Sequence, residues 1–203
     1  LTNLIARFYD PTEGAVELDG ADLRTIDVES YRRILGIVEQ DVFLFDGTVA
    51  ENISRFGAVD AKRVTEAAQW AGIHEMVLTL PQAYDTPLIG GGVALSAGQQ
   101  QRIGIARAIY GRPRVVVLDE PNANLDQAGE AALLTTLRHL QQDSCTVVMV
   151  THRPHVLQAV QKIALLVQGT LARYGSREDV QALITRSTQP VVPPRQAGSV
   201  SLA

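Results

Sequence analysis

The amino-acid sequence predicts an α/β fold in which helices cover both faces of a parallel β-sheet. Residues 115–118 and 145–150 are short, continuous apolar runs, and strands that are buried on both faces have this pattern. Helical patterns lie between these runs, and alternation of strands with helices is typical of a parallel sheet. A third apolar run, residues 162–167, follows a short predicted helix and is expected to be a further strand of the same kind.

The first part of the chain predicts a helix followed by a small β-rich edge. Apolar residues at positions 1–8 share one helical face, and this pattern stops at the turn-forming residues 10–14. Alternating residues at 15–18, followed by Asp-Gly, predict a hairpin strand, and residues 34–38 predict a second, more buried strand. We expect these two strands to form a small antiparallel edge.

Helices dominate the middle of the chain, where a helical sub-lobe is predicted at roughly residues 48–110. Asp60 predicts an N-cap, and the helical pattern runs from it to Leu80, where a proline ends it. Ser96 predicts the N-cap of a helix that reaches about Tyr110.

Two more helices are predicted towards the C-terminus, at residues 127–142 and 177–185. Residues 188–203 contain three prolines and offer little to bury, so they are expected to form a disordered tail. The folded domain is therefore expected to span residues 1–187.

The composition excludes several classes of function. Lys and Arg number 18 against 22 Asp and Glu, and they are spread along the chain, so a nucleic-acid partner is not expected. Cys145 stands alone, which excludes an internal disulfide and a multi-cysteine metal site and fits a reducing compartment. No apolar run approaches the ~20 residues of a membrane-spanning helix, and no secretory signal is visible.

Two adjacent carboxylates, Asp119 and Glu120, follow the apolar run at 115–118. Ligands bind at the carboxyl ends of parallel strands, so these side chains are expected where a metal ion and a water molecule are held in phosphate chemistry. Taken alone, the pattern is equally consistent with a solvated acidic turn.

Two further segments bear on phosphate chemistry. Residues 95–99 open a helix, and the N–H groups of a helix N-terminus form an anion site together with the helix dipole. By itself this segment favours an ordinary Ser-capped helix. His152 follows the strand predicted at 145–150, and a His at such a place is more often a surface residue than a catalytic one. Here, however, its strand is expected to lie beside the one that carries Glu120.

Together these segments resemble the nucleotide-binding domain of the ABC transporter family, over nearly all of residues 1–187. Five short segments carry the resemblance in the family's order and with about its spacing, so the combination is specific although each segment is weak alone. They are Val38-Glu39-Gln40 (Q-loop), residues 95–108 (signature motif), 115–120 (Walker B), 123–126 (D-loop) and Thr151-His152 (H-loop). The resemblance implies a P-loop-type ATPase core that binds ATP and Mg²⁺.

The resemblance also implies a role for each site residue. Asp119 would hold Mg²⁺ through water, and Gln40 would complete the metal shell and sense the transmembrane partner. Glu120 would be the general base, and His152 would contact the γ-phosphate. Asp126 would communicate between two nucleotide sites. The resemblance also implies that the start of the signature motif contacts nucleotide, and that Ser96 and Gly98 do so by reaching across to a second domain. The residues are Leu95, Ser96, Ala97, Gly98 and Gln99.

The chain departs from the family pattern in two places. Ala97 stands where the family usually has Gly, and its methyl group is expected to weaken activity at most. No G-x-x-x-x-G-K-[ST] loop occurs in the chain, and the resemblance implies that this loop lies just before Leu1. The chain by itself is therefore expected to lack half of its ATP site and to be inactive.

Further segments resemble exporter-type domains. Residues 45–53 follow the Q-loop, and residues 84–90 resemble the X-loop, which touches the coupling helices of an exporter. Residues 119–126, together with 151–154, resemble type I secretion ATPases. Segments near the N-terminus and around the Q-loop look more like lipid, peptide or drug exporters, so that class stays open as the alternative.

The resemblance implies two partners: the transmembrane domain of the same transporter and a second nucleotide-binding domain. Hydrolysis at the cytoplasmic face of the inner (plasma) membrane would drive export. Two rival functions remain. A soluble ABC ATPase that acts on ribosomes or DNA would share the Asp119, Glu120 and His152 set, but would usually carry two such domains or a long coiled-coil insertion. The second rival is a nucleotide-binding remnant that does not hydrolyse ATP.

Overall fold

The computed structural model describes residues 1–88 and 93–180, which fall into two compact units. The first unit is Leu1–His152 and the second begins at Arg153. Within the described residues, no helix combines the length and the apolarity that crossing a membrane requires.

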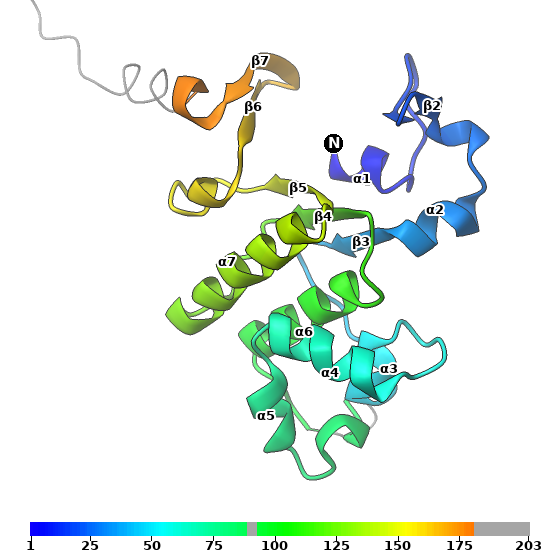
Figure 1. Ribbon diagram of the computed structural model, residues 1–203, viewed down its shortest axis with the longest axis vertical. Helices are drawn as coiled ribbons and strands as arrows, with labels where there is room; N and C mark the ends of the chain where they lie inside the picture. Colours follow the sequence, from blue (N-terminus) through cyan, green and yellow to red (C-terminus); the bar gives the residue numbers. More distant parts are fainter. Residues whose placement is uncertain (89–92, 181–203) are drawn as a thin grey trace, which may run out of the picture. The chain divides into compact units, whose positions relative to one another are not determined.

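A three-stranded parallel sheet forms the centre of the first unit (Figure 1). Its strands are β3 (Leu35–Val38), β4 (Val115–Asp119) and β5 (Thr146–Val150), in the order β3-β4-β5. Val115 to Leu118 in the middle strand are all buried, as their continuous apolar run predicts. The predicted parallel α/β core is confirmed.

The strand at Leu35–Val38 corrects one prediction. It was expected to pair with the N-terminal hairpin, but it pairs parallel with β4, with Val38 opposite Leu118. The reason lies in its composition, since a strand without polar residues suits a sheet covered on both faces better than an exposed edge. Gly36 allows helix α6 (Ala97–Ile109) to approach, because a Cβ there would clash with the Ala108 carbonyl oxygen.

The predicted hairpin near the N-terminus is present but short. Strands β1 (Glu17–Leu18) and β2 (Ala21–Asp22) pair antiparallel. The turn between them places Asp19 at φ 51° and Gly20 at φ 81°, a pair of left-handed residues that Asp-Gly adopts readily.

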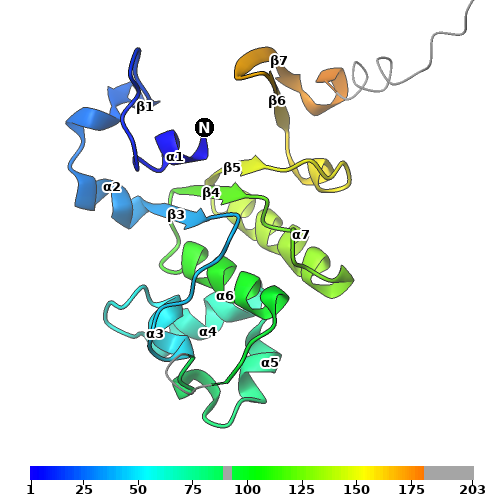
Figure 2. The ribbon, with the colours of Figure 1, turned by 180° about the vertical axis from the view of Figure 1, so that it is seen from behind.

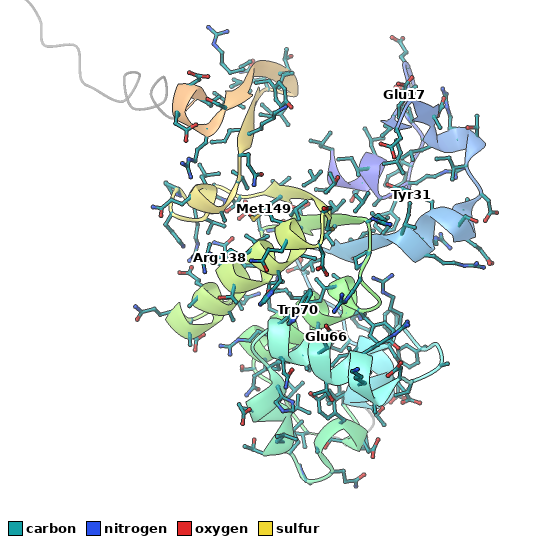
Figure 3. All side chains as sticks on the ribbon, viewed as in Figure 1. Glu17, Tyr31, Glu66, Trp70, Arg138 and Met149 are labelled. Atoms are coloured by element: carbon teal, nitrogen blue, oxygen red, sulfur yellow. The ribbon has the colours of Figure 1, made fainter. Side chains whose placement is uncertain are left out.

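Helix α1 (Thr2–Ile5) is shorter than the predicted 1–8, because Arg7 has a left-handed φ of 55° and cannot continue the helix. The 3-10 helix η1 (Leu23–Thr25) and helix α2 (Val28–Ile34) were not predicted. Tyr31 of α2 is buried and donates a hydrogen bond of 2.6 Å to the Ile5 carbonyl, which joins α2 to α1 (Figure 3).

The helical part of the first unit contains α3 (Val49–Ile53), α4 (Ala61–Trp70), α5 (His74–Leu78), the 3-10 helix η2 (Ala83–Asp85) and α6 (Ala97–Ile109) (Figure 2). The N-caps predicted at Asp60 and Ser96 both accept hydrogen bonds from the first turn of their helices. The single helix predicted from Asp60 to Leu80 is wrong. It breaks at Gly72, whose φ of 66° ends α4 before α5 begins.

Helix α7 (Gln127–Gln142) packs against β5 and has the predicted bounds. Cys145, which follows this helix, is buried as expected. Burial raises the pKa of its thiol to about 11, so the thiol stays protonated at neutral pH.

The Arg55 side chain connects the C-terminal ends of helices α6 and α2. Its guanidinium donates to the carbonyls of Arg107 and Ala108 at the C-terminal end of α6, at 3.0 and 2.7 Å. It also donates to the carbonyls of Arg32 and Leu35 at the end of α2, at 3.4 and 2.9 Å. Helix C-terminal carbonyls lack partners within their own helix, so one cation satisfies two helix ends.

We therefore expect Arg55→Ala to lower the free energy of unfolding by about 2–4 kcal/mol, because several part-buried carbonyls lose their donor. Denaturant-induced unfolding measures this loss. Arg33→Ala is the matched control, since its side chain is 77% exposed and its ion pair with Glu29 is long, at 3.9 Å. Equal unfolding free energies for the two variants would contradict the structural role of Arg55.

The second unit contains the 3-10 helix η3 (Val156–Ala159) and a hairpin of β6 (Lys162–Val167) and β7 (Thr170–Ser176). Residues 162–167 do form a strand, but its partner is β7 in an antiparallel pairing, so the prediction of a parallel strand covered on both faces is corrected. The turn residues Gln168 and Gly169 are both left-handed, which is typical of a tight hairpin. Residues 177–180 are helical, and the rest of the predicted 177–185 helix and the 188–203 tail lie outside the described residues.

Candidate functional site

Three strands of the parallel sheet end at the same edge, and each is followed by a predicted site residue. Gln40 lies two residues beyond β3, Glu120 directly follows β4, and His152 lies two residues beyond β5. The pairing of Asp119 with Val150 and a 2.9 Å bond from the Glu120 amide to the Val150 carbonyl hold β4 and β5 in register. The sheet therefore brings these polar residues to one edge.

Glu120 and His152 are in direct contact. The His152 Nδ1 atom lies 2.7 Å from the Glu120 Oε1 atom. The Glu120 side chain is only 14% exposed, whereas that of His152 is 83% exposed. Because an ionised carboxylate can only accept, Nδ1 carries a proton in this pair, which leaves Nε2 for a different partner. The two residues thus form one unit in which a shielded carboxylate orients an accessible imidazole.

The backbone at Glu120 is in an uncommon conformation. Its φ is 44°, in the left-handed region that large side chains rarely adopt. Two backbone bonds hold it there: the Glu120 amide donates to Val150, and the Ala123 amide donates to the Glu120 carbonyl at 3.0 Å. Backbone strain of this kind persists where the surrounding structure imposes it, and such positions cluster at functional sites.

Asp119 and Gln40 line a common cavity of about 290 Å³. The Asp119 Oδ2 atom accepts a 2.8 Å hydrogen bond from the Thr2 hydroxyl of α1. The described residues contain no cluster of three or more His, Cys, Asp or Glu that would hold a metal alone. One carboxylate and one amide oxygen nevertheless suit Mg²⁺ in a nucleotide site, where the ion keeps water ligands and binds substrate phosphates.

The N-terminus of α6 is a fully formed capping box. The Ser96 hydroxyl accepts from the Gln99 amide at 3.3 Å, and the Gln99 side chain accepts from the Ser96 amide at 2.9 Å. Gly98 packs tightly on the loop after Glu120, because a Cβ at Gly98 would lie 2.7 Å from the Asn124 carbonyl oxygen. Ala97 is exposed, so its methyl group is not enclosed by the described residues.

Asp126 caps helix α7. Its Oδ1 atom accepts from the Gly129 amide at 2.8 Å and from the Arg102 Nη2 atom at 2.5 Å. The Gly129 amide is the main cause that lowers the pKa of this carboxyl, and Arg102 adds to it. Sequence analysis did not single out Arg102, although it lies within the signature segment 95–108.

Asn122 is a second residue that sequence analysis missed. It is fully buried, and its side-chain oxygen accepts from the Thr151 hydroxyl at 3.3 Å. This bond joins the loop after Glu120 to the residue before His152. The signal was present, since both residues belong to the two segments that resemble type I secretion ATPases.

Residues 1–123 match the model of the ABC transporter family. The chain belongs to the ABC transporter family. It is 40% identical over 191 residues to the type I secretion system ATP-binding protein PrsD of Rhizobium meliloti, covering 93% of this chain and 33% of that protein. It is 41% identical over 184 residues to the cyclolysin secretion/processing ATP-binding protein CyaB of Bordetella pertussis, covering 90% of this chain and 26% of CyaB.

A solved structure of a bacterial Atm1-family ABC exporter with ATP bound is also similar. It superimposes with a TM-score of 0.81 at 34% identity and covers 93% of this chain and 34% of that exporter. The chain thus spans about a third or less of the length of these ABC proteins. ATP-binding domains of this family are ATPases, and the chain has the α/β core of such a domain.

The site residues that the resemblance implies form two groups within the first unit. Gln40, Asp119, Glu120 and His152 lie at the edge of the sheet. Leu95 to Gln99 and Asp126 lie at the N-termini of α6 and α7, and in the described part of the chain none of their hydrogen bonds goes to Glu120 or His152. The two groups are thus not hydrogen-bonded through Glu120 or His152, although Gly98 packs on the loop that follows Glu120.

Proposed function

We propose that this chain is the ATP-binding and hydrolysing domain of an ABC exporter, with type I protein secretion as its process. The 2.7 Å contact between Glu120 and His152 carries the proposal. Phosphoryl transfer to water needs a positioned base and a donor at the terminal phosphate, and this pair supplies both from adjacent strand ends.

Each residue of the sheet edge has a distinct part in this proposal. Glu120 accepts a proton from the attacking water, and its bond to His152 keeps the imidazole oriented. Both bonds need the imidazolium form of the ring, which donates from Nδ1 to Glu120 and from Nε2 to a γ-phosphate oxygen. Asp119 and Gln40 would hold Mg²⁺, which neutralises charge on the phosphates when it is bound.

A second nucleotide-binding domain completes the site in this proposal. Ser96 and Ala97 are exposed at the N-terminus of α6, where the helix dipole and backbone N–H groups favour an anion. Their exposed position, and the lack of a hydrogen bond to Glu120 among the described residues, support binding to ATP held by another domain. Asp126 is also accessible, with 68% of its side chain exposed.

An exposed aromatic patch supports a transmembrane domain as the other partner. The patch consists of Phe43, Phe45 and Phe56, which are 64%, 51% and 48% exposed. Their rings meet edge to face, at 5.4 Å between the first two and 5.9 Å between the last two. Contiguous exposed apolar groups of this kind mark interaction sites, and the patch begins three residues after Gln40. The domain would then lie at the cytoplasmic face of the inner membrane.

The cargo is proposed from the relatives. PrsD and CyaB are named as secretion ATP-binding proteins, which supports an unfolded polypeptide as the exported substrate. Export of lipids, peptides or drugs is the alternative, because residues 7–11 and 36–40 resemble segments of such exporters. A remnant that binds nucleotide without hydrolysis is a further alternative.

Phosphate release by the full-length protein tests the proposal. We expect ATP turnover that stops when a chelator removes Mg²⁺ and returns when Mg²⁺ is added in excess. Turnover should increase with an unfolded secretion substrate and stay unchanged with lipids or drugs. ATP binding without phosphate release would favour the remnant, and stimulation by lipid or drug alone would overturn the assignment to protein secretion.

A further inference from the structure

Arg102 of helix α6 connects its own helix with the start of α7 and with the turn that ends α4. Its Nη2 atom makes the 2.5 Å ion pair with Asp126, at the start of α7. Its Nη1 atom donates to the Gly72 carbonyl at 3.3 Å, in the turn that ends α4. The helix that carries Arg102 also carries Ser96 and Gly98 at its N-terminus.

The guanidinium of Arg102 lies in a confined environment next to Gly129. The Arg102 side chain is 17% exposed, and a Cβ on Gly129 would lie 3.1 Å from both its Nε and Nη2 atoms. A side chain at position 129 would also lie 3.0 Å from the Asp126 Oδ1 atom, so both partners of the ion pair would have to shift slightly. These contacts need a rigid planar group that donates hydrogen bonds in two fixed directions. The guanidinium of arginine is such a group, and the ammonium of lysine is not.

The ion pair orients the Asp126 carboxylate. Both hydrogen bonds described for this side chain, from Gly129 and from Arg102, go to Oδ1. The carboxylate is 68% exposed, so these two bonds fix the direction in which it faces outward. A pair with such an exposed partner contributes little to stability, so its main consequence is orientation.

We infer that Arg102 is a positioning residue that sets the orientation of Asp126 and couples it to the Gly72 turn of the helical part, an assignment that rests on the proposed function of Asp126 between two nucleotide sites. A displacement of the end of α4 moves the Gly72 carbonyl that Nη1 contacts. The rigid guanidinium then transmits this displacement to Asp126 through Nη2. Arg102 itself contacts neither nucleotide nor water in the reaction.

The test is a double-mutant cycle in ATP turnover of the full-length protein. Arg102→Met keeps the apolar stem and removes both donors. Asp126→Asn keeps a good N-cap for α7 and removes the charge. Each single variant should lower kcat about tenfold with KM for ATP unchanged, and the double variant should be no slower than either one. Arg138→Met, on an exposed position of α7 (Figure 3), is the matched control and should keep wild-type kcat.

Each outcome of this cycle decides the inference. Loss of kcat in Asp126→Asn but not in Arg102→Met would overturn the inference and leave the proposed function standing. Additive losses would also overturn it, because the residues would then act independently. An unchanged kcat in Asp126→Asn would remove the proposed role of Asp126 and the inference with it. If the Arg102→Met variant does not fold, Arg102→Lys replaces it in the cycle. We then expect a partial loss of kcat in the otherwise wild-type protein, and no further loss of kcat when Arg102→Lys is combined with Asp126→Asn.

Discussion

Replacing Glu120 by Gln is expected to lower ATP turnover by at least about a hundredfold while ATP binding is retained. Gln has the shape of Glu and its side-chain oxygen still accepts from His152, so the 2.7 Å contact survives. What is lost is the ability to take a proton from water. Phosphate release and ATP binding, measured on the same preparation of the full-length protein, separate the two effects.

The matched control for this variant is Glu17→Gln. Glu17 is an exposed residue of β1 (Figure 3), and its substitution makes the same change of charge away from the sheet edge. It should leave turnover at the wild-type rate. Turnover by the Glu120 variant that equals the control would show that Glu120 is not the base.

The second large effect is expected for His152→Ala. Removal of one preorganised group at a developing charge typically slows a reaction by about 10²- to 10³-fold, so we expect a loss of that size. The unfolding free energy should hardly change, because the side chain is 83% exposed. Turnover and thermal unfolding, compared side by side, measure the two quantities.

His139→Ala is expected to show the opposite pattern, with a loss of stability and no loss of turnover. Its ring stacks on Trp70 with centroids 4.6 Å apart, far along α7 from the capping residue Asp126. Losing that stack should lower stability by about 1 kcal/mol and leave turnover unchanged. If His152→Ala instead reduced stability and spared turnover, its contact with Glu120 would be structural.

Local signals predicted much of the fold. The apolar run at β4, the caps at Asp60 and Ser96, and the Asp19-Gly20 turn were all correct, since each depends on neighbouring residues. Strand partners were less predictable. Leu35–Val38 and Lys162–Val167 were identified as strands but given the wrong partners, because pairing is decided by residues far away in the sequence.

The same distinction holds at the candidate site. The meeting of Glu120 and His152 was predicted, because adjacent parallel strands end at one edge. Three features of the site were not predicted: the left-handed backbone of Glu120, the Asn122–Thr151 hydrogen bond, and the contact of Arg102 with Asp126. Each of these depends on tertiary packing that no periodicity in the sequence reveals.

The position of the γ-phosphate in the Glu120→Gln protein, solved with ATP and Mg²⁺, tests the central claim most directly. We expect the His152 Nε2 atom at about 3 Å from a γ-phosphate oxygen, with the side chain at position 120 facing the water in line with that phosphate. A terminal phosphate bound elsewhere, with His152 and position 120 directed into separate regions, would contradict the account.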